Sequence, residues 1–198
     1  MRSALGPVGL AIGFVVAIWL VAAAAGWDDG QVATWVPRSG AVAAVVIVAL
    51  LVLDVVAPLP GSVLMVAAGS VLGPVAGTGV NAVGLLGAFL VGQAIGTAVA
   101  RQAASPRRPH PMPPVLVAAT RGFPVAGEAV ALAAGAAGGD RRTLVGAAAA
   151  GSLLVGGLYA VVGAELGATP LLVIVGTVGA AALQASLWWV LRRRSQPV

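Results

Sequence analysis

The amino-acid sequence predicts an all-α polytopic membrane protein with about four transmembrane helices and two re-entrant helical hairpins arranged as an inverted repeat. Composition is the first observation: 60% of the 198 residues are hydrophobic and 9% are charged, whereas a soluble domain has about 25% charged residues. The second is a set of apolar stretches long enough to cross about 30 Å of hydrocarbon as helices. The third is a pair of apolar stretches that proline and glycine interrupt.

Uninterrupted apolar stretches supply the predicted transmembrane helices, because each has about the 20 residues that a helix needs to cross a bilayer. They are residues 8–26, 79–100, 144–163 and 171–191. The first stretch follows Arg2 and ends in AAAAG, so it also fits a cleaved signal peptide. We favour an uncleaved signal anchor, because the stretch is long for a signal peptide and no secreted domain follows it.

Two interrupted stretches, residues 41–73 and 115–138, predict the hairpins. The first is broken at PLPG and the second at RGFP, and the residues assigned to the breaks are Pro58, Pro60, Gly61, Pro124 and Gly127. Irregular backbone at membrane depth is tolerated only where it is buried or lines a cavity. The limb 115–120 is far too short to span, whereas the limb 41–57 is nearly long enough, so two full crossings stay open for the first hairpin.

Arginine determines the predicted orientation, because the chain has no lysine and carries a net charge of +5. If each hairpin enters and leaves on one side, every arginine at the end of a predicted span except Arg38 is cytoplasmic, as the positive-inside rule requires. The chain is then a multi-pass protein of the bacterial plasma (inner) membrane with a cytoplasmic C-terminus. Its three parts are an N-terminal anchor and outer segment (1–40), a core (41–163), and a C-terminal helix with a basic tail (164–198).

An internal repeat supports this plan. SVLMVAAGS, from Ser62, aligns without gaps with EAVALAAGA, from Glu128, and each follows a proline and glycine break. Entry from opposite sides of the membrane makes the two halves an inverted-topology repeat, which is common among transporters.

The ordered motifs PLPGSVLMVAAGSVLGPVAG, GLLGAFLVGQAIG and RGFPVAGEAVALAAGA resemble the DedA or VTT (SNARE-associated Golgi protein) membrane protein family over about residues 52–163. The resemblance implies two re-entrant hairpins and movement of lipids across a bilayer, as in polyprenyl-phosphate carrier flippases and phospholipid scramblases. Ser62 stands where many DedA-type members carry a carboxylate, and Gln93 where many carry arginine. The match is therefore closer to the broader VTT branch.

Three ionisable residues in the interrupted stretches, Asp54, Arg121 and Glu128, are the predicted substrate and proton site. Such residues usually face protein or a water-filled cavity, because burial in lipid is costly. We expect the hairpin tips to meet near the midplane of the membrane. There Arg121 offers a forked donor to phosphate oxygens, and the two acids take up and release protons. In one alternative Arg121 anchors a helix end by reaching the cytoplasmic surface, and in another it forms a fixed ion pair with the acids.

Polar residues near this site, Ser62, Asn81 and Gln93, are candidates to line the cavity. A run of small residues along residues 84–96 predicts close helix packing, and Asn81 or Gln93 is expected to hydrogen-bond across such an interface.

Other classes of function are disfavoured. Cysteine is absent and His110 is the only histidine, so no metal or cofactor is expected. The serines at 62, 70 and 152 have no histidine partner, so we do not expect an enzyme, and the arginine excess reports orientation and lipid contact rather than nucleic acid. The expected function is a flippase or scramblase for a phosphate-bearing lipid. A small-solute or ion transporter and a non-transporting scaffold are the alternatives, and homo-oligomerisation is left open.

Overall fold

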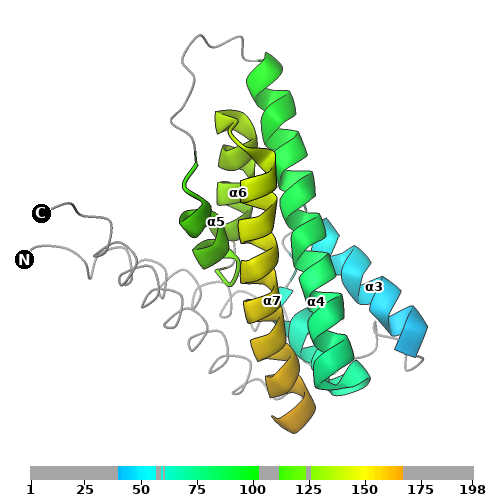
Figure 1. The fold of residues 1–198 in the computed structure, drawn as a ribbon. Coiled ribbons are helices and arrows are strands. Elements are labelled where there is room, and N and C mark those ends of the chain that lie inside the picture. The colour runs from blue at the N-terminus through cyan, green and yellow to red at the C-terminus, as the bar shows by residue number, and fades with distance from the viewer. Residues whose placement is uncertain (1–39, 57–58, 60, 103–111, 124–125, 167–198) are drawn as a thin grey trace, which may run out of the picture.

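The structure is a computed structural model that describes residues 40–56, 59, 61–102, 112–123 and 126–166. The described part of the chain is all-helical (Figure 1). Its helices are α3 (Gly40–Leu53), α4 (Gly61–Gln102), α5 (Pro114–Thr120), α6 (Ala126–Ala137) and α7 (Arg141–Leu166). The predicted spans 8–26 and 171–191 lie outside the described residues, as do Pro58, Pro60 and Pro124.

The two longest helices, α4 and α7, run antiparallel side by side through the molecule (Figure 1). Both are long and apolar enough to cross a membrane, with mean hydropathies of 1.8 and 1.9. They contain the predicted spans 79–100 and 144–163. Large apolar side chains such as Val75, Val83 and Leu153 are exposed on them, and a lipid environment would accept these side chains without the cost that water imposes.

Helix α4 consists of two limbs joined at Gly73. The backbone of Gly73 has φ 78° and ψ 172°, a conformation that breaks the helix and that glycine adopts without strain. Pro74 follows and has no backbone N–H to continue the helical hydrogen bonds. We call residues 61–72 the short limb and residues 74–102 the long limb.

Each interrupted stretch folds as two short helices with a break between them. The first pair is α3 and the short limb of α4, and the second is α5 and α6. The described part of α3 has 14 residues, and α5 and α6 have 7 and 12 residues. Figure 1 shows the two pairs lying toward opposite ends of the α4 and α7 helices.

The short helix that carries AAG in each half packs against the long helix of the other half. A Cβ atom added at Gly69 of the short limb would overlap the carbonyl oxygen of Ala160 in α7. Gly69 and Gly135 are the glycines of the two aligned AAG segments, and a Cβ at Gly135 of α6 would overlap the carbonyl oxygen of Gln93 in the long limb. Each short helix thus crosses the long helix of the other half at an equivalent glycine.

At both crossings the long helix also has a glycine at the contact. A Cβ at Gly163 of α7 would overlap the carbonyl of Val66, and a Cβ at Gly96 of the long limb would overlap the carbonyl of Leu132. Val66 and Leu132 are aligned residues of the repeat. Absence of a side chain lets two helix backbones approach closely at both crossings. These matching contacts are those expected of an inverted repeat.

A third matching contact joins the first helix of each pair to the long helix of its own half. A Cβ at Gly84 would lie 2.6 Å from Leu51 of α3, and a Cβ at Gly151 would overlap the carbonyl oxygen of Ala118 in α5. The predicted small-residue face of α4 is therefore a packing face, as its composition indicates.

Two hydrophobic clusters surround these crossings. One joins α3, the short limb and α7, with Ile47, Val66 and Tyr159 fully or almost fully buried. The other joins the long limb, α5, α6 and the start of α7 through Phe89 and Val117. Each cluster encloses one helix pair, so each pair is held by its own set of apolar contacts.

Helix α7 begins at an acidic cap. Oδ1 of Asp140 accepts a hydrogen bond of 3.1 Å from the backbone N–H of Arg142, and Oδ2 accepts one from the hydroxyl of Thr143. These bonds hold the pKa of the Asp140 carboxyl below its ordinary value of 3.8. The carboxylate also lies at the positive end of the helix dipole, so the charged form stabilises the start of α7.

We expect Asp140→Ala to lower the melting temperature at neutral pH and to have a smaller effect in acid. Because the folded-state pKa of Asp140 lies below 3.8, its contribution is complete above the unfolded-state pKa and is lost as the pH falls through the folded-state pKa. Melting temperatures of both proteins in neutral detergent, measured between about pH 7 and about pH 3, test this. A difference that stays constant or grows in acid would contradict the capping role.

Candidate functional site

Arg121 is buried at the break between α5 and α6. It is the C-terminal cap of α5 and only 5% of its surface is exposed. Its Nη1 donates a hydrogen bond of 3.2 Å to the carbonyl oxygen of Leu85, and its guanidinium carbon lies 5.4 Å from the centre of the Phe89 ring. The alternative in which Arg121 reaches the cytoplasmic surface is therefore wrong, because α5 ends in mid-molecule and points this side chain at the long limb of α4.

Glycines make room for this side chain. A Cβ added at Gly127 would lie 2.7 Å from Nη2 of Arg121, and one added at Gly151 of α7 would lie 2.9 Å from its Cγ. Gly127, which the sequence assigned to the break, is the second residue of α6. Its missing side chain leaves room for the guanidinium of Arg121. A side chain at either position would displace the arginine.

Asp54 occupies the corresponding place in the first hairpin. It is half-buried directly after α3, as Arg121 is directly after α5, and its Oδ1 accepts a hydrogen bond of 2.8 Å from the N–H of Leu59. A Cβ added at Gly61 would lie 2.8 Å from Oδ2 of Asp54, as one at Gly127 would from Arg121. The two hairpins therefore carry an acid and a base, each directly after the first helix of its pair.

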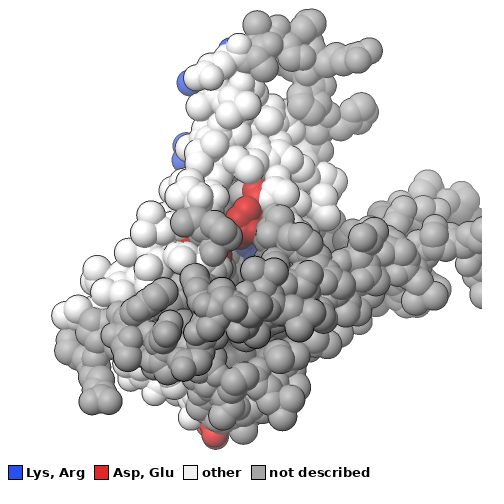
Figure 2. All heavy atoms as spheres, turned by 180° about the vertical axis from the view of Figure 1, so that it is seen from behind, with Lys and Arg blue, Asp and Glu red and all other residues white. Residues whose placement is uncertain are grey.

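Glu128 brings the two hairpins into one electrostatic cluster. It lies in the first turn of α6 and is half-buried, and its carboxylate interacts electrostatically with both Asp54 and Arg121. Figure 2 shows acidic and basic side-chain atoms meeting in the middle of one face of the molecule. The structure thus brings together all three residues of the predicted site, and we call them the central charged cluster.

The central charged cluster is not closed by hydrogen bonds. Within the described residues, Nε of Arg121 and Oε2 of Glu128 are buried and have no hydrogen-bond partner. Unpaired buried polar atoms are rare in native proteins and call for water, an ion or a ligand to satisfy them.

Ser152, next to Gly151 in α7, carries a buried hydroxyl. It is fully buried, its Oγ is without a partner in the described structure, and it follows Gly151, which contacts Arg121. The sequence was interpreted for Ser152 only as a possible nucleophile, and its burial without a hydrogen-bond partner was not predicted. The only sequence signal was a single serine in the middle of the apolar stretch 144–163. The sequence does not show which residues of other helices this serine faces.

The predicted polar lining residues have different surroundings. Asn81 is fully buried and donates from Nδ2 to the carbonyls of Met65 and Gly156, both at 3.0 Å, so it bonds across helices as expected. Its Oδ1 has no partner in the described part of the chain. Ser62 is half-buried directly after Gly61, whereas Gln93 lies farther along the long limb, beside a cavity described below.

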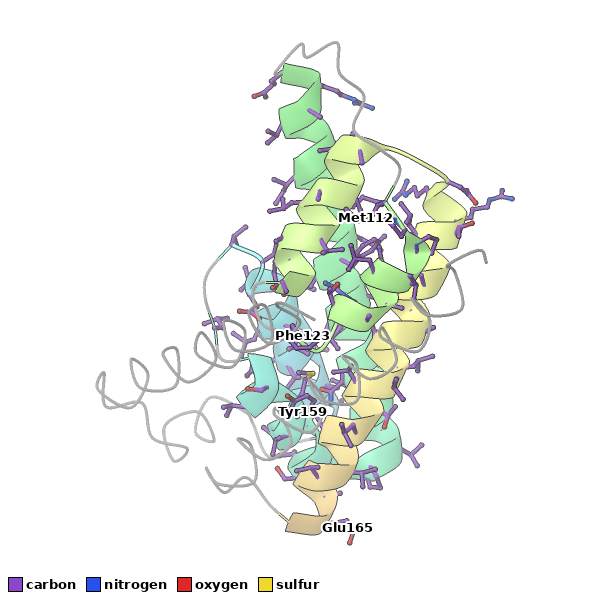
Figure 3. All side chains as sticks on the ribbon, turned by 90° about the vertical axis from the view of Figure 1, so that its left-hand side faces the viewer. Met112, Phe123, Tyr159 and Glu165 are labelled. Atoms are coloured by element: carbon purple, nitrogen blue, oxygen red, sulfur yellow. The ribbon has the colours of Figure 1, made fainter. Side chains whose placement is uncertain are left out.

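The hairpin tip lies midway along the long helices. Figure 3 places Phe123, just after Arg121, near the middle of the α4 and α7 pair, and Glu165 at the far end of α7. Glu165 is exposed and stands apart from the central charged cluster. Among the described residues, no group of three histidine, cysteine, aspartate or glutamate side chains could hold a metal ion.

Comparison with protein-family models, with curated proteins and with solved structures gives no match to this chain.

Proposed function

We propose that this chain is an integral membrane transporter that moves a phosphate-bearing lipid across the bacterial plasma membrane, as the resemblance to the DedA or VTT family implies. The observation that carries the proposal is the central charged cluster, a buried arginine and two acids at the meeting of two helix breaks, with Nε of Arg121 and Oε2 of Glu128 unpaired. The two long apolar helices support a membrane setting.

Phosphate suits this arginine for chemical reasons. The guanidinium presents several donors in a planar fork that matches two phosphate oxygens. One of its nitrogens is bonded to the carbonyl of Leu85 and another is unpaired, so the side chain is oriented yet retains a free donor. A phosphate there would also balance the buried positive charge.

The acids supply a route to proton coupling. A phosphate that binds Arg121 competes with the carboxylate of Glu128 for the same positive charge. It also brings a further negative charge toward the carboxylates of Asp54 and Glu128, which already repel each other. Lipid entry and proton uptake would then be linked in one step.

The two helix pairs are proposed as re-entrant hairpins that dip into the bilayer from opposite faces. Their short helices and their positions toward opposite ends of the long pair support this. With the spans at 8–26 and 171–191, the chain would cross the membrane about four times and end in the cytoplasm.

Reconstitution into liposomes tests the function. The wild type is expected to move a fluorescent phosphate-bearing lipid between leaflets, and Arg121→Gln and Glu128→Gln each to lower the rate by about tenfold or more, since each removes a charge-assisted contact. Arg142→Gln and Glu165→Gln are matched controls that change exposed residues away from the cluster and should leave the rate unchanged.

Three results would contradict parts of the proposal. Equal rates in the wild type and in both cluster variants would remove the cluster from the mechanism. No lipid movement by the folded wild type, with uptake of an ion or small solute, would favour that alternative, and no movement of either would favour a scaffold. A lipid rate that does not respond to an imposed pH gradient would exclude proton coupling.

A further inference from the structure

A separate cavity lies at the arginine-bearing end of the long helices. It has a volume of about 390 Å³ and is bounded by the end of the long limb of α4, the end of α6 and the start of α7. Its position differs from that of the central charged cluster, since none of Asp54, Arg121 or Glu128 lines it. Nothing in the function proposed above uses this cavity.

The mouth of the cavity is positively charged. Arg101, in the last turn of α4, and Arg141, the first residue of α7, both line it, and among the described residues no acidic side chain does. Asp140 lies next to Arg141 in the sequence, but its two carboxylate oxygens are bonded to the N–H of Arg142 and the hydroxyl of Thr143. The two guanidinium groups therefore have no carboxylate of the cavity to neutralise them.

The wall of the cavity is mostly apolar. Gln93 lines it two helical turns, or about 12 Å, from Arg101, and the wall includes Leu90, Ala94 and Leu144. The hydroxyl of Thr97 bonds to the carbonyls of Gln93 and Gly135 at 2.8 and 3.1 Å, which joins α4 to α6 along this wall.

A charged mouth above an apolar interior matches an amphiphile. Arginine pairs bind phosphate oxygens well, and apolar walls accept the first carbons of an acyl or prenyl chain. We propose that this cavity is a second phosphate-binding site, in which Arg101 and Arg141 hold the phosphate group of an anionic lipid while its chain lies along α4. The site binds whether or not lipid is moved across the membrane.

Photo-labelling in nanodiscs tests the site. Wild-type protein in phosphatidylcholine nanodiscs with a small fraction of photoactivatable phosphatidic acid should be labelled on peptides of α4 and α7 that line the cavity. The double variant Arg101→Gln/Arg141→Gln should reduce this labelling by about fivefold or more, as the loss of two partly exposed charged contacts implies. Arg142→Gln, which removes a neighbouring charge that does not line the cavity, should change it by less than about twofold.

A second pair of variants keeps both arginines. Ala98→Trp should fill the cavity and reduce labelling, because Ala98 lines it. Val99→Trp is its matched control, since Val99 is 59% exposed and lies outside the lining. Arg121→Gln should leave labelling unchanged, so a failure of lipid transport does not affect this result.

Competition identifies the source of the phosphate. Suppression of labelling by unlabelled phosphatidic acid but not by millimolar inorganic phosphate supports a lipid head group, whereas suppression by inorganic phosphate supports the same anion site with a free ligand. Labelling that falls equally in Arg142→Gln would overturn the proposal, because it would report general attraction to a basic surface. Unchanged labelling in both the double variant and Ala98→Trp would overturn it as well.

Discussion

Gly69→Ala and Gly135→Ala are each expected to lower the free energy of unfolding by about 3 kcal/mol or more, at or above the upper end of the cost of overpacking. The added methyl group would overlap a backbone carbonyl of the facing helix. A backbone cannot yield as a flexible side chain does, so the two helices would have to separate. Unfolding in increasing fractions of denaturing detergent, followed by circular dichroism, gives the measurement.

Gly79→Ala and Gly146→Ala are the matched controls. Both glycines lie within the long helices and have nothing within 4 Å of an added Cβ. Alanine there should leave stability unchanged or raise it by about 0.5–1 kcal/mol, because alanine loses less backbone entropy in a helix than glycine does. A similar loss of stability at all four positions would show that the crossings are not close contacts.

Arg121→Met is expected to destabilise the protein by about 2–4 kcal/mol, because it removes a buried hydrogen bond and leaves the charge of Glu128 without its counter-charge. The methionine retains an apolar side chain of similar length against Phe89, so lost packing contributes little. Arg142→Met, at an exposed position, should change stability by less than about 0.5 kcal/mol. The same detergent titration gives these values.

Coupling between the two charges separates electrostatics from packing. The double variant Arg121→Met/Glu128→Gln should lose less free energy of unfolding than the sum of the losses in the two single variants, by about 1 kcal/mol. The reason is that the double variant no longer has an uncompensated carboxylate. Strictly additive losses would mean that Glu128 does not sense Arg121, which contradicts the cluster on which the proposed function depends.

Much of the helical organisation could be predicted from the sequence. Proline and glycine at residues 58–61 and 121–124 disrupt helical hydrogen bonds wherever they occur, and the described helices end and begin around them. The pair Gly73-Pro74 likewise ends the short limb of α4. The aligned AAG segments also predicted the repeat, because similar local sequences in equivalent halves make similar contacts.

The site was predicted in part. Rarity of charge in an apolar chain was sufficient to single out Asp54, Arg121 and Glu128, since burial of each has a cost that must be offset. The contact of Gly151 in α7 with Arg121 was missed, because it depends on how two helices pack. The cavity between Arg101 and Arg141 was missed for the same reason, since these residues are 40 positions apart in the sequence.

The sequence by itself determined where helices break and which residues carry charge, because both follow from backbone chemistry and composition close to each residue. Only the tertiary structure decided which helix each glycine faces, that Arg121 points inward to Leu85 rather than outward to the surface, and that the two hairpins share one cluster. The physical reason is that nearly every surface of this chain is apolar. Hydrophobicity therefore does not distinguish one helix face from another, and close packing of small residues makes that choice.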